Sequence, residues 1–377
     1  DAADRLLPRA VDRSLRLARF TFRGLLPRYG VGIYDEPRHN SFPPATLFLV
    51  ESLLLWGKVD EASRFLSAYL LRYGREDGAL DYYGPSLSEY GQLLDLTARL
   101  IQWCHRRDLV EGLGQIIAPL ARRCAELVSQ SAAAGQVVPG LPEADYHADA
   151  DAQNRSYASG YLWLLRGLRS LASALAKVDA PGIADCVPEA LVGDAELSSL
   201  VAPALTPVGK TGFLPALVGD DHVIHRMTES REASYTNYRF WPEMLSSGLM
   251  PDKAVKAILQ WRREHGGELA GMTRFADWLD DWPVWNHALG LLQVGDGDTF
   301  TMLLWAHLLY HQMLGWWPSY EQVDILPDDH GWRQQRNGQV VPCQVTAALM
   351  LRAGLLWGDR DGRELSVLPA GKLLLDT

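Results

Sequence analysis

The chain has 377 residues, of which 47% are apolar, and its formal net charge is -10. This length and apolar content allow a substantial buried core, and no apolar run reaches the roughly 18 residues that a membrane span needs. Nucleic acid is disfavoured as a partner, because phosphate binding requires a basic stripe and the basic residues here are scattered along an acidic chain.

Apolar residues recur at helical spacing along nearly the whole chain, and Gly, Pro and Asp mark the ends of the periodic segments. The spacing predicts twelve helices, in chain order at residues 5–26, 45–56, 61–73, 87–106, 109–133, 156–176, 186–204, 235–247, 252–264, 282–294, 299–312 and 344–357.

The links between these helices alternate in length. Those after the even-numbered helices are tight and span residues 57–59, 107–108, 179–182, 248–250 and 295–297. Those after the odd-numbered helices are long and rich in aromatic and ionisable residues, which favours a functional role over disorder. The alternation predicts an all-α fold of six antiparallel helix pairs closed in a ring, an (α/α)6 toroid. The long links would then gather at one end of the inner, even-numbered helices.

We expect residues 1–377 to form one catalytic domain, and alternating residues at 362–377 predict a short β extension packed on it. The chain starts at Asp1, without a Met or a secretory pattern, which leaves room for an additional domain or partner chain upstream. The sequence does not decide the cellular compartment of the protein. The four widely spaced cysteines show neither a disulfide framework nor metal-ligand spacing, and they favour the cytoplasm.

The link before the helix at 156–176 is the first of two segments that carry carboxylates. Asp149 and Asp151 lie where acidic side chains stabilise a helix N-terminus. Glu143 and Asp145 lie too far upstream for that role. We therefore predict that they line the end of the ring where the long links converge.

The link before the helix at 344–357 holds the second carboxylate segment. Trp316 and Trp317 precede Glu321, which is flanked by Tyr320 and Gln322. Hydrolysis by an activated water requires a carboxylate that accepts a proton and apolar walls that exclude bulk solvent. This segment supplies both.

In its alternation of helices and links, its acidic segment and its Glu321-Gln322-Val323 string, the chain resembles the six-hairpin (α/α)6 glycosidases, most nearly the glucoamylase and glucodextranase type. The resemblance implies a glycoside hydrolase in which Glu321 is the general base and Glu143, or else Asp145, is the general acid. The expected substrate is a neutral oligosaccharide or glycoconjugate. Cleavage with inversion is expected where the two carboxyl groups lie about 6.5–9.5 Å apart.

Aromatic and charged side chains of the long links are predicted to form the substrate-binding walls. Trp faces suit stacking on sugar rings, and Arg274 with Asp277 suits a clamp on vicinal hydroxyls. Asp281 is instead predicted to cap the helix at 282–294. The predicted substrate-binding residues are Tyr34, Asp35, Arg38, Asp81, Tyr82, Tyr83, Tyr238, Arg239, Arg274, Asp277, Trp278, Trp316 and Trp317.

No cofactor or metal is expected. His307 and His311 are four residues apart and share one helix face, but no carboxylate lies between them as a zinc-protease motif requires.

Three other classes fit parts of the pattern. A sugar epimerase or polysaccharide lyase on the same toroid would use a cluster such as His225, Tyr235, Tyr238 and Arg239 to abstract a proton next to a carbonyl or carboxylate. The acidic motif at 278–282 faintly suggests a terpene cyclase, but such enzymes require a deep apolar cavity and these links are polar. A non-catalytic carbohydrate-binding protein would keep the aromatic residues without an opposed carboxylate pair.

Overall fold

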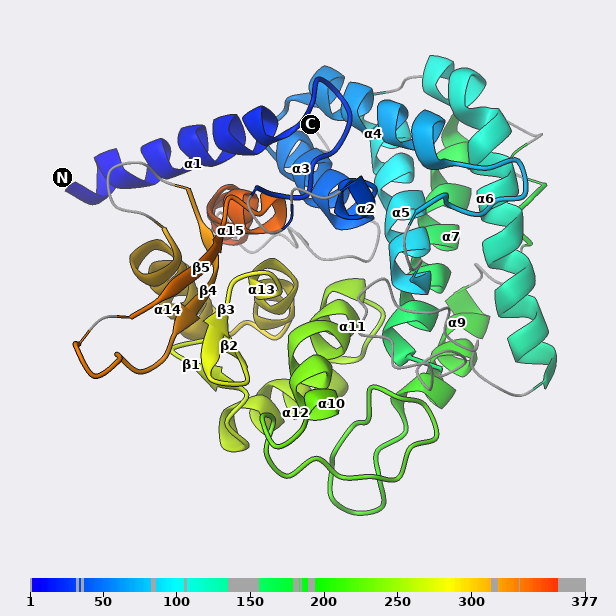
Figure 1. Cartoon of the computed structure of the whole chain (residues 1–377). Helices are drawn as coiled ribbons and strands as arrows, with labels where there is room; N and C mark the ends of the chain where they lie inside the picture. The colour runs from blue at the N-terminus through cyan, green and yellow to red at the C-terminus, as the bar shows by residue number, and fades with distance from the viewer. Residues whose placement is uncertain are drawn as a thin grey trace.

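The computed structural model describes residues 2–31, 34, 37–82, 86–104, 107–134, 156–178, 183, 185–188, 194–312, 318–331 and 333–358. Within these residues the predicted (α/α)6 toroid is confirmed (Figure 1). The predicted β extension at 362–377 lies outside the described residues. No described helix is both long enough and apolar enough to cross a bilayer.

The inner ring consists of helices that are buried on most of their faces. Each inner helix contacts the next, and the last contacts the first, so the ring closes. In α3 nearly every residue is buried, as expected of a helix that is apolar all round. The inner helices are α3 (Pro43–Leu55), α5 (Leu87–Cys104), α7 (Ala158–Val178), α11 (Trp241–Ser247), α13 (Val284–Gln293) and α15 (Val341–Gly358).

The outer helices bury one face against this ring and expose the other. In α12, for example, Val255, Ile258 and Leu259 are buried, at the spacing of one helical stripe. The outer helices are α1 (Ala2–Thr21), α4 (Val59–Tyr73), α6 (Arg107–Ala134), α9 (Asp194–Val201), α12 (Asp252–Glu264) and α14 (Gly297–Ala306). The long links lead into the first turns of the inner helices, and we call this end of the ring the mouth.

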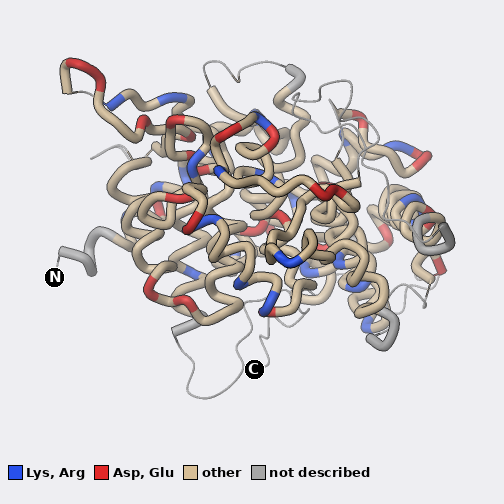
Figure 2. Tube along the Cα trace, turned by 90° about the horizontal axis from the view of Figure 1, so that it is seen from below, with Lys and Arg blue, Asp and Glu red and all other residues tan. Residues whose placement is uncertain are grey.

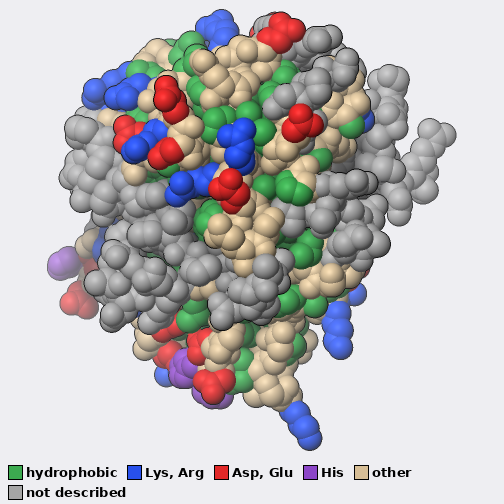
Figure 3. Space-filling model, turned by 90° about the vertical axis from the view of Figure 1, so that its right-hand side faces the viewer, with side chains coloured by type: hydrophobic (Ala, Val, Ile, Leu, Met, Phe, Trp, Pro, Cys, Tyr) green, Lys and Arg blue, Asp and Glu red, His purple; other side chains and the backbone are tan. Residues whose placement is uncertain are grey.

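Basic and acidic residues are interspersed along the described trace rather than separated into stripes (Figure 2). On the face turned to the viewer in Figure 3, the hydrophobic side chains appear between charged and polar ones and not as one continuous area.

Some predicted helix ends were wrong. The first helix ends at Thr21 and not at residue 26, because Arg23 and Leu26 pair in a tight turn through Gly24, which has a φ of 64°. Residues 185–188 form a turn, and the helix expected from Cys186 begins at Asp194. Pro188 lies in that turn, and a proline disfavours a helical conformation of the residue before it.

π-Helical turns occur in two places, before the inner helix α11 and at the end of the outer helix α14. A helix α10 (Arg231–Tyr235) leads through the π-turn η5 (Thr236–Phe240) into α11, and α14 ends in the π-turn η6 (His307–His311). Such single turns insert one residue more than an α-helical turn and are frequent at functional sites. Two further short helices lie in links: α2 (Pro37–Asn40) and η4 (Ala202–Leu205).

A five-stranded antiparallel sheet stands beside α13, α14 and α15 (Figure 1). Its strands, in spatial order, are β1 (Glu268–Leu269), β2 (Met272–Phe275), β3 (Trp278–Asp280), β4 (Tyr320–Asp324) and β5 (Gln335–Gly338). We expected these segments to be irregular links, and that expectation was wrong. The sheet joins the links before α13 and α15, with Asp280 paired opposite Gln322.

Candidate active site

Four segments that are distant in sequence converge at the mouth around Glu321. Glu321 lies on β4, Asn337 lies on β5, and Tyr34 lies in the link before α3. Asp280 is the last residue of β3, and Asp281 is the next residue in the link to α13. We call Asp280, Asp281 and Glu321 the carboxylate cluster. All three side chains are almost completely shielded from solvent.

The Glu321 carboxylate is held by two donors on one of its oxygens. The Tyr34 hydroxyl donates to Oε2 at 2.8 Å, and the Asn337 amide donates to the same oxygen at 2.7 Å. No described residue donates to Oε1. Burial raises the pKa of Glu321 to about 7, although the two hydrogen bonds oppose this rise. A carboxylate with a pKa near the working pH is suited to accept a proton from water.

Asp280 and Asp281 place further charge beside Glu321. The Asp280 carboxylate accepts hydrogen bonds from the Trp282 N–H at 3.0 Å and from the Gln322 amide at 3.1 Å. Burial, followed by the charge of Glu321, raises the pKa of Asp280 well above its usual range. Neighbouring buried carboxylates disfavour one another's ionisation, so Asp280 and Glu321 retain a proton more readily than isolated acids would.

Asp281 is paired with a buried histidine from the π-turn η6. The distance between His307 Nδ1 and Asp281 Oδ1 is 2.7 Å, and both side chains are 0% exposed. The prediction that Asp281 caps α13 was wrong. The cap residue is Pro283, and no side chain bonds there. The next histidine, His311, bonds the Tyr320 carbonyl oxygen through Nδ1 at 2.9 Å, and its burial lowers its pKa.

Aromatic residues form a layer beside the cluster. The Tyr238 ring stacks on Trp282 with centroids 5.4 Å apart, and it also contacts Phe275. Trp278 is half-buried, with the Arg336 guanidinium 5.3 Å from its ring centroid. Two of the predicted wall residues, Tyr238 and Trp278, are therefore near one another through Phe275, which also stacks on Trp278.

Arg239 is buried and already engaged. Its Nη2 lies 3.4 Å from Glu89 Oε1 and its Nε lies 3.2 Å from Glu243 Oε1, and all three residues are at most 2% exposed. Glu89 stands in the first turn of α5, at the mouth. The arrangement makes Arg239 the counter-charge of two buried carboxylates.

The remaining predicted wall residues fall in different places. Tyr34 reaches the carboxylate cluster, whereas Tyr82 is half-buried and accepts a hydrogen bond from the Ser86 N–H at 2.9 Å. Asp81 and Asp277 are exposed. Arg274 is half-buried, and the clamp of Arg274 and Asp277 on the vicinal hydroxyls of a sugar stays a prediction. Outside the described residues lie Asp35, Tyr83, Glu143, Asp145, Trp316 and Trp317, together with the side chain of Arg38.

Of the predicted proton-abstracting cluster, Tyr235 and Tyr238 are in ring contact, with centroids 5.9 Å apart, whereas His225 does not join them. His225 is exposed, and its backbone oxygen bonds the ring of His265 at 2.7 Å. No hydrogen bond or ring contact joins its side chain to Tyr235, Tyr238 or Arg239.

The sequence reasoning missed two contributors to the site. Asn337 escaped attention because its link was read as irregular, although an Asn followed by Gly338 is a turn signal and Asn337 has a φ of 55°. His307 was considered only for metal binding. Its partner Asp281 lies 26 residues away, and no spacing rule connects them.

A scan against protein-family models finds no match, and a search of the curated proteins finds none either. Solved structures match over nearly the whole chain. A glycosidase variant in complex with glucose is 11% identical with a TM-score of 0.57, and the match covers 95% of this chain and 99% of that one. An unsaturated glucuronyl hydrolase specific for heparin is 11% identical with a TM-score of 0.53, covering 94% and 98%.

A cellobiose 2-epimerase from Bacillus thermoamylovorans B4167 is 10% identical with a TM-score of 0.57, and the match covers 93% of this chain and 99% of that one. At such identities these likenesses establish the toroid fold alone. Both hydrolysis and epimerisation are represented among the similar structures, so the reaction has to be argued from the site.

Proposed function

We propose that this protein is a glycoside hydrolase in which Glu321 is the general base. The observation that carries the proposal is the asymmetric environment of its carboxylate. Tyr34 and Asn337 both donate to Oε2, and Oε1 has no donor among the described residues. One oxygen is thus fixed in position, while the other is available to accept a proton from a water molecule.

Burial supports the same role. A general base works best when its pKa lies near the operating pH, and burial raises the pKa of Glu321 to about 7. The aromatic layer beside the cluster, in which Tyr238 and Trp282 are buried, supplies apolar walls that exclude bulk solvent from the site. A neutral oligosaccharide or glycoconjugate remains the substrate class that we propose.

The general acid is proposed from the sequence as Glu143, with Asp145 as the alternative. In the proposed reaction, that acid protonates the glycosidic oxygen while Glu321 deprotonates a water molecule on the opposite face of the sugar. The water oxygen then bonds to the anomeric carbon as the glycosidic bond breaks, which inverts the configuration.

The test compares the wild type with Glu321→Gln on a panel of glycans, and follows the anomers of the products by NMR. Glu321→Gln keeps the shape and the two hydrogen-bonded neighbours but cannot accept a proton as a carboxylate does. We expect a loss in kcat of roughly 10²–10⁴. Asp324→Asn is the matched control, because Asp324 lies on the same strand and pairs with the exposed Arg336. Full activity of Glu321→Gln would exclude Glu321 as the base.

The second candidate is a sugar epimerase, and the observation that favours it is the buried pair of Asp281 and His307. A carboxylate on Nδ1 fixes the tautomer and the orientation of an imidazole, which suits proton abstraction next to a carbonyl. Epimerised products that disappear in His307→Gln and persist in Glu321→Gln would favour this reaction. Sugar binding without turnover by the wild type would instead favour a binding protein.

A further inference from the structure

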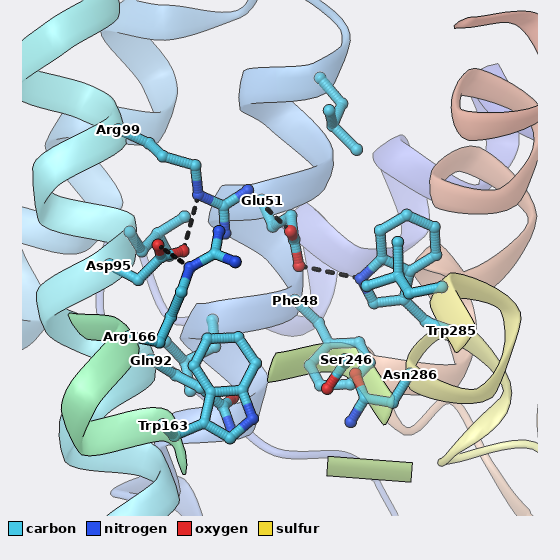
Figure 4. Close-up of a pocket in the computed structure, with 14 residues that line it drawn as sticks. Phe48, Glu51, Gln92, Asp95, Arg99, Trp163, Arg166, Ser246, Trp285 and Asn286 are labelled. Carbon is cyan, nitrogen blue, oxygen red and sulfur yellow. Dashed lines mark hydrogen bonds and ion pairs between the residues drawn. The ribbon is translucent and has the colours of Figure 1, made fainter. Parts of the chain in front are cut away.

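A polar cavity lies inside the ring, and it is lined by residues other than those of the carboxylate cluster. It has a volume of about 40 Å³, and its lining comes from α3, α5, α7, α11 and α13 (Figure 4). Trp285 and Asn286 stand in the first turn of α13, whereas Glu51 and Ser246 stand in the second half of α3 and of α11, so the cavity extends from the mouth end of α13 into the interior of the ring. No member of the carboxylate cluster lines it.

Both carboxylates in the cavity wall are paired with arginine side chains. Glu51 accepts from Arg99 Nη1 at 2.8 Å and from the Trp285 indole N–H at 2.9 Å, one on each oxygen. Asp95 Oδ1 accepts from Arg166 Nε at 2.8 Å and from the Ser170 hydroxyl at 2.6 Å. Its Oδ2 pairs with Arg99 Nε at 3.0 Å. No carboxylate oxygen therefore remains to attract a cation.

Each of the two guanidinium groups has a nitrogen that makes no hydrogen bond with a described residue. Arg166 donates from Nε to Asp95 and from Nη1 to the Ser247 carbonyl. Arg99 donates from Nη1 to Glu51, and its Nε lies at ion-pair distance from Asp95 without making a hydrogen bond. Neither Nη2 has a partner among the described residues. Figure 4 shows the two guanidinium groups beside one another, between Asp95 and Glu51. Burial lowers the pKa of Arg166 and the neighbouring Arg99 charge adds to this, while Asp95 opposes it.

Two amide side chains approach the cavity from opposite sides, Gln92 from α5 and Asn286 from α13 (Figure 4). Neither makes a hydrogen bond with a described residue. Asn286 is only 7% exposed, and a polar group buried to that extent normally has a partner. The unused hydrogen-bonding groups are thus two guanidinium nitrogens and two amides, a set dominated by donors.

We propose that this cavity binds a small monovalent anion of the size of chloride, held by Arg99, Arg166 and Asn286. Donors that belong to charged groups make the strongest hydrogen bonds to an anion. The two carboxylates and two guanidinium groups cancel in net charge, so the attraction rests on these short-range donors and favours a singly charged ion. A volume of about 40 Å³ holds roughly three waters, which suits a small ion.

An anion bound in this cavity would also restrain the aromatic residues at the mouth. Phe48 and Trp285 line the cavity, and the Phe48 ring packs on Trp282 with centroids 5.9 Å apart. Trp282 follows Asp281 directly. An anion that fixes the cavity wall therefore stiffens the base on which the aromatic layer rests.

The test uses bromide, which is a monovalent anion that can be located by its anomalous scattering. We expect one bromide peak within hydrogen-bonding distance of Arg99, Arg166 and Asn286 in crystals of the wild type. We also expect a saturable rise in Tm in sodium bromide relative to sodium gluconate at equal ionic strength, because gluconate is too large for the cavity. Neither readout requires turnover, so the result is independent of the proposed glycosidase activity.

Asn286→Asp keeps the shape of the side chain but replaces a donor with a negative charge. We expect bromide to bind roughly tenfold to hundredfold more weakly, the effect of losing one hydrogen bond to a charged group. Gln335→Glu, an exposed amide-to-carboxylate change on β5, is the matched control and should respond like the wild type. Should Asn286→Asp fail to fold, Gln92→Glu replaces it. A cavity that holds only water in the bromide crystals, or an equal Tm response in the variant and the wild type, overturns the proposal.

Discussion

The Tyr34 hydroxyl donates a 2.8 Å hydrogen bond to Glu321, although 287 positions separate the two residues in the sequence. Tyr34 precedes α3, which opens the inner ring, and Glu321 lies on β4, which precedes α15, the helix that closes it. The direct contact between α15 and α3 brings these two links together. Closure of the toroid and orientation of the candidate base therefore depend on the same part of the fold.

Tyr34→Phe removes one of the two donors to Glu321. The hydrogen bond from Tyr34 lowers the pKa of Glu321, so its loss should raise that pKa further above 7. A base is active only when deprotonated, and the acidic limb of the kcat/KM profile should therefore move to higher pH. The measurement is kcat/KM against pH, with Tyr73→Phe on the outer helix α4 as the control. An unmoved acidic limb would show that Tyr34 does not position the base.

Glu321 should make the folded protein less stable as pH rises. Its pKa is about 7 in the folded state against an ordinary 4.5, so the folded state binds the proton more tightly than the unfolded state does. The contribution of the Glu321 proton to the free energy of unfolding is fully present below about pH 4.5, and it is lost as the pH rises through about 7. The shift corresponds to about 3 kcal/mol.

Glu321→Gln carries no titrating proton at this position. Its free energy of unfolding relative to the wild type should therefore increase between pH 5 and pH 8. Urea unfolding of both proteins at the two pH values measures this difference. A difference that does not change with pH would mean that Glu321 keeps an ordinary pKa despite its burial.

The helices of the ring could be predicted because the apolar spacing that indicates a helix lies within each helical segment. Residues at 61–73 and 252–264 repeat their apolar positions every three or four residues, and the helices α4 and α12 begin and end within a few residues of those ranges. The strands gave no comparable signal. β3 spans Trp278–Asp280 only, and it pairs with β2 on one edge and with β4, about forty residues later, on the other. Three residues are too few to reveal an alternating pattern.

The same division applies to the candidate site. Glu321 could be singled out from the residues around it, whereas its second donor, Asn337, is brought to it by the pairing of β4 with β5. The partner of Asp281 depends on where the π-turn η6 places His307. Contacts of this kind are decided by the packing of distant segments, and a single sequence does not encode them in any local pattern.

The pair of Asp281 and His307 should be energetically coupled. Both side chains are 0% exposed, so removal of either partner leaves a buried polar group unpaired. We expect a coupling free energy of roughly 1–3 kcal/mol from a double-mutant cycle of Asp281→Asn and His307→Gln, measured by urea unfolding. Additive effects of the two substitutions would show that the contact contributes nothing beyond the packing of each side chain.

Gly91 should tolerate no side chain, because it lies where α5 and α7 touch. A Cβ at Gly91 would lie far inside van der Waals contact with the carbonyl of Trp163, and a Cβ at Gly167 would collide with the carbonyl of Gly91. This close approach also lets Asp95 on α5 reach Arg166 on α7. Gly91→Ala should therefore force the helices apart and lower the free energy of unfolding by about 1–3 kcal/mol or more.

Gly112 provides the matched control for this prediction. It lies on the outer helix α6, and a Cβ there would meet nothing within 4 Å. Gly112→Ala should stabilise the protein by about 0.5–1 kcal/mol, because alanine loses less backbone entropy than glycine on entering a helix. Urea midpoints of the two variants should thus move in opposite directions. Equal midpoints would mean that the backbones of α5 and α7 do not approach as closely as the ring requires.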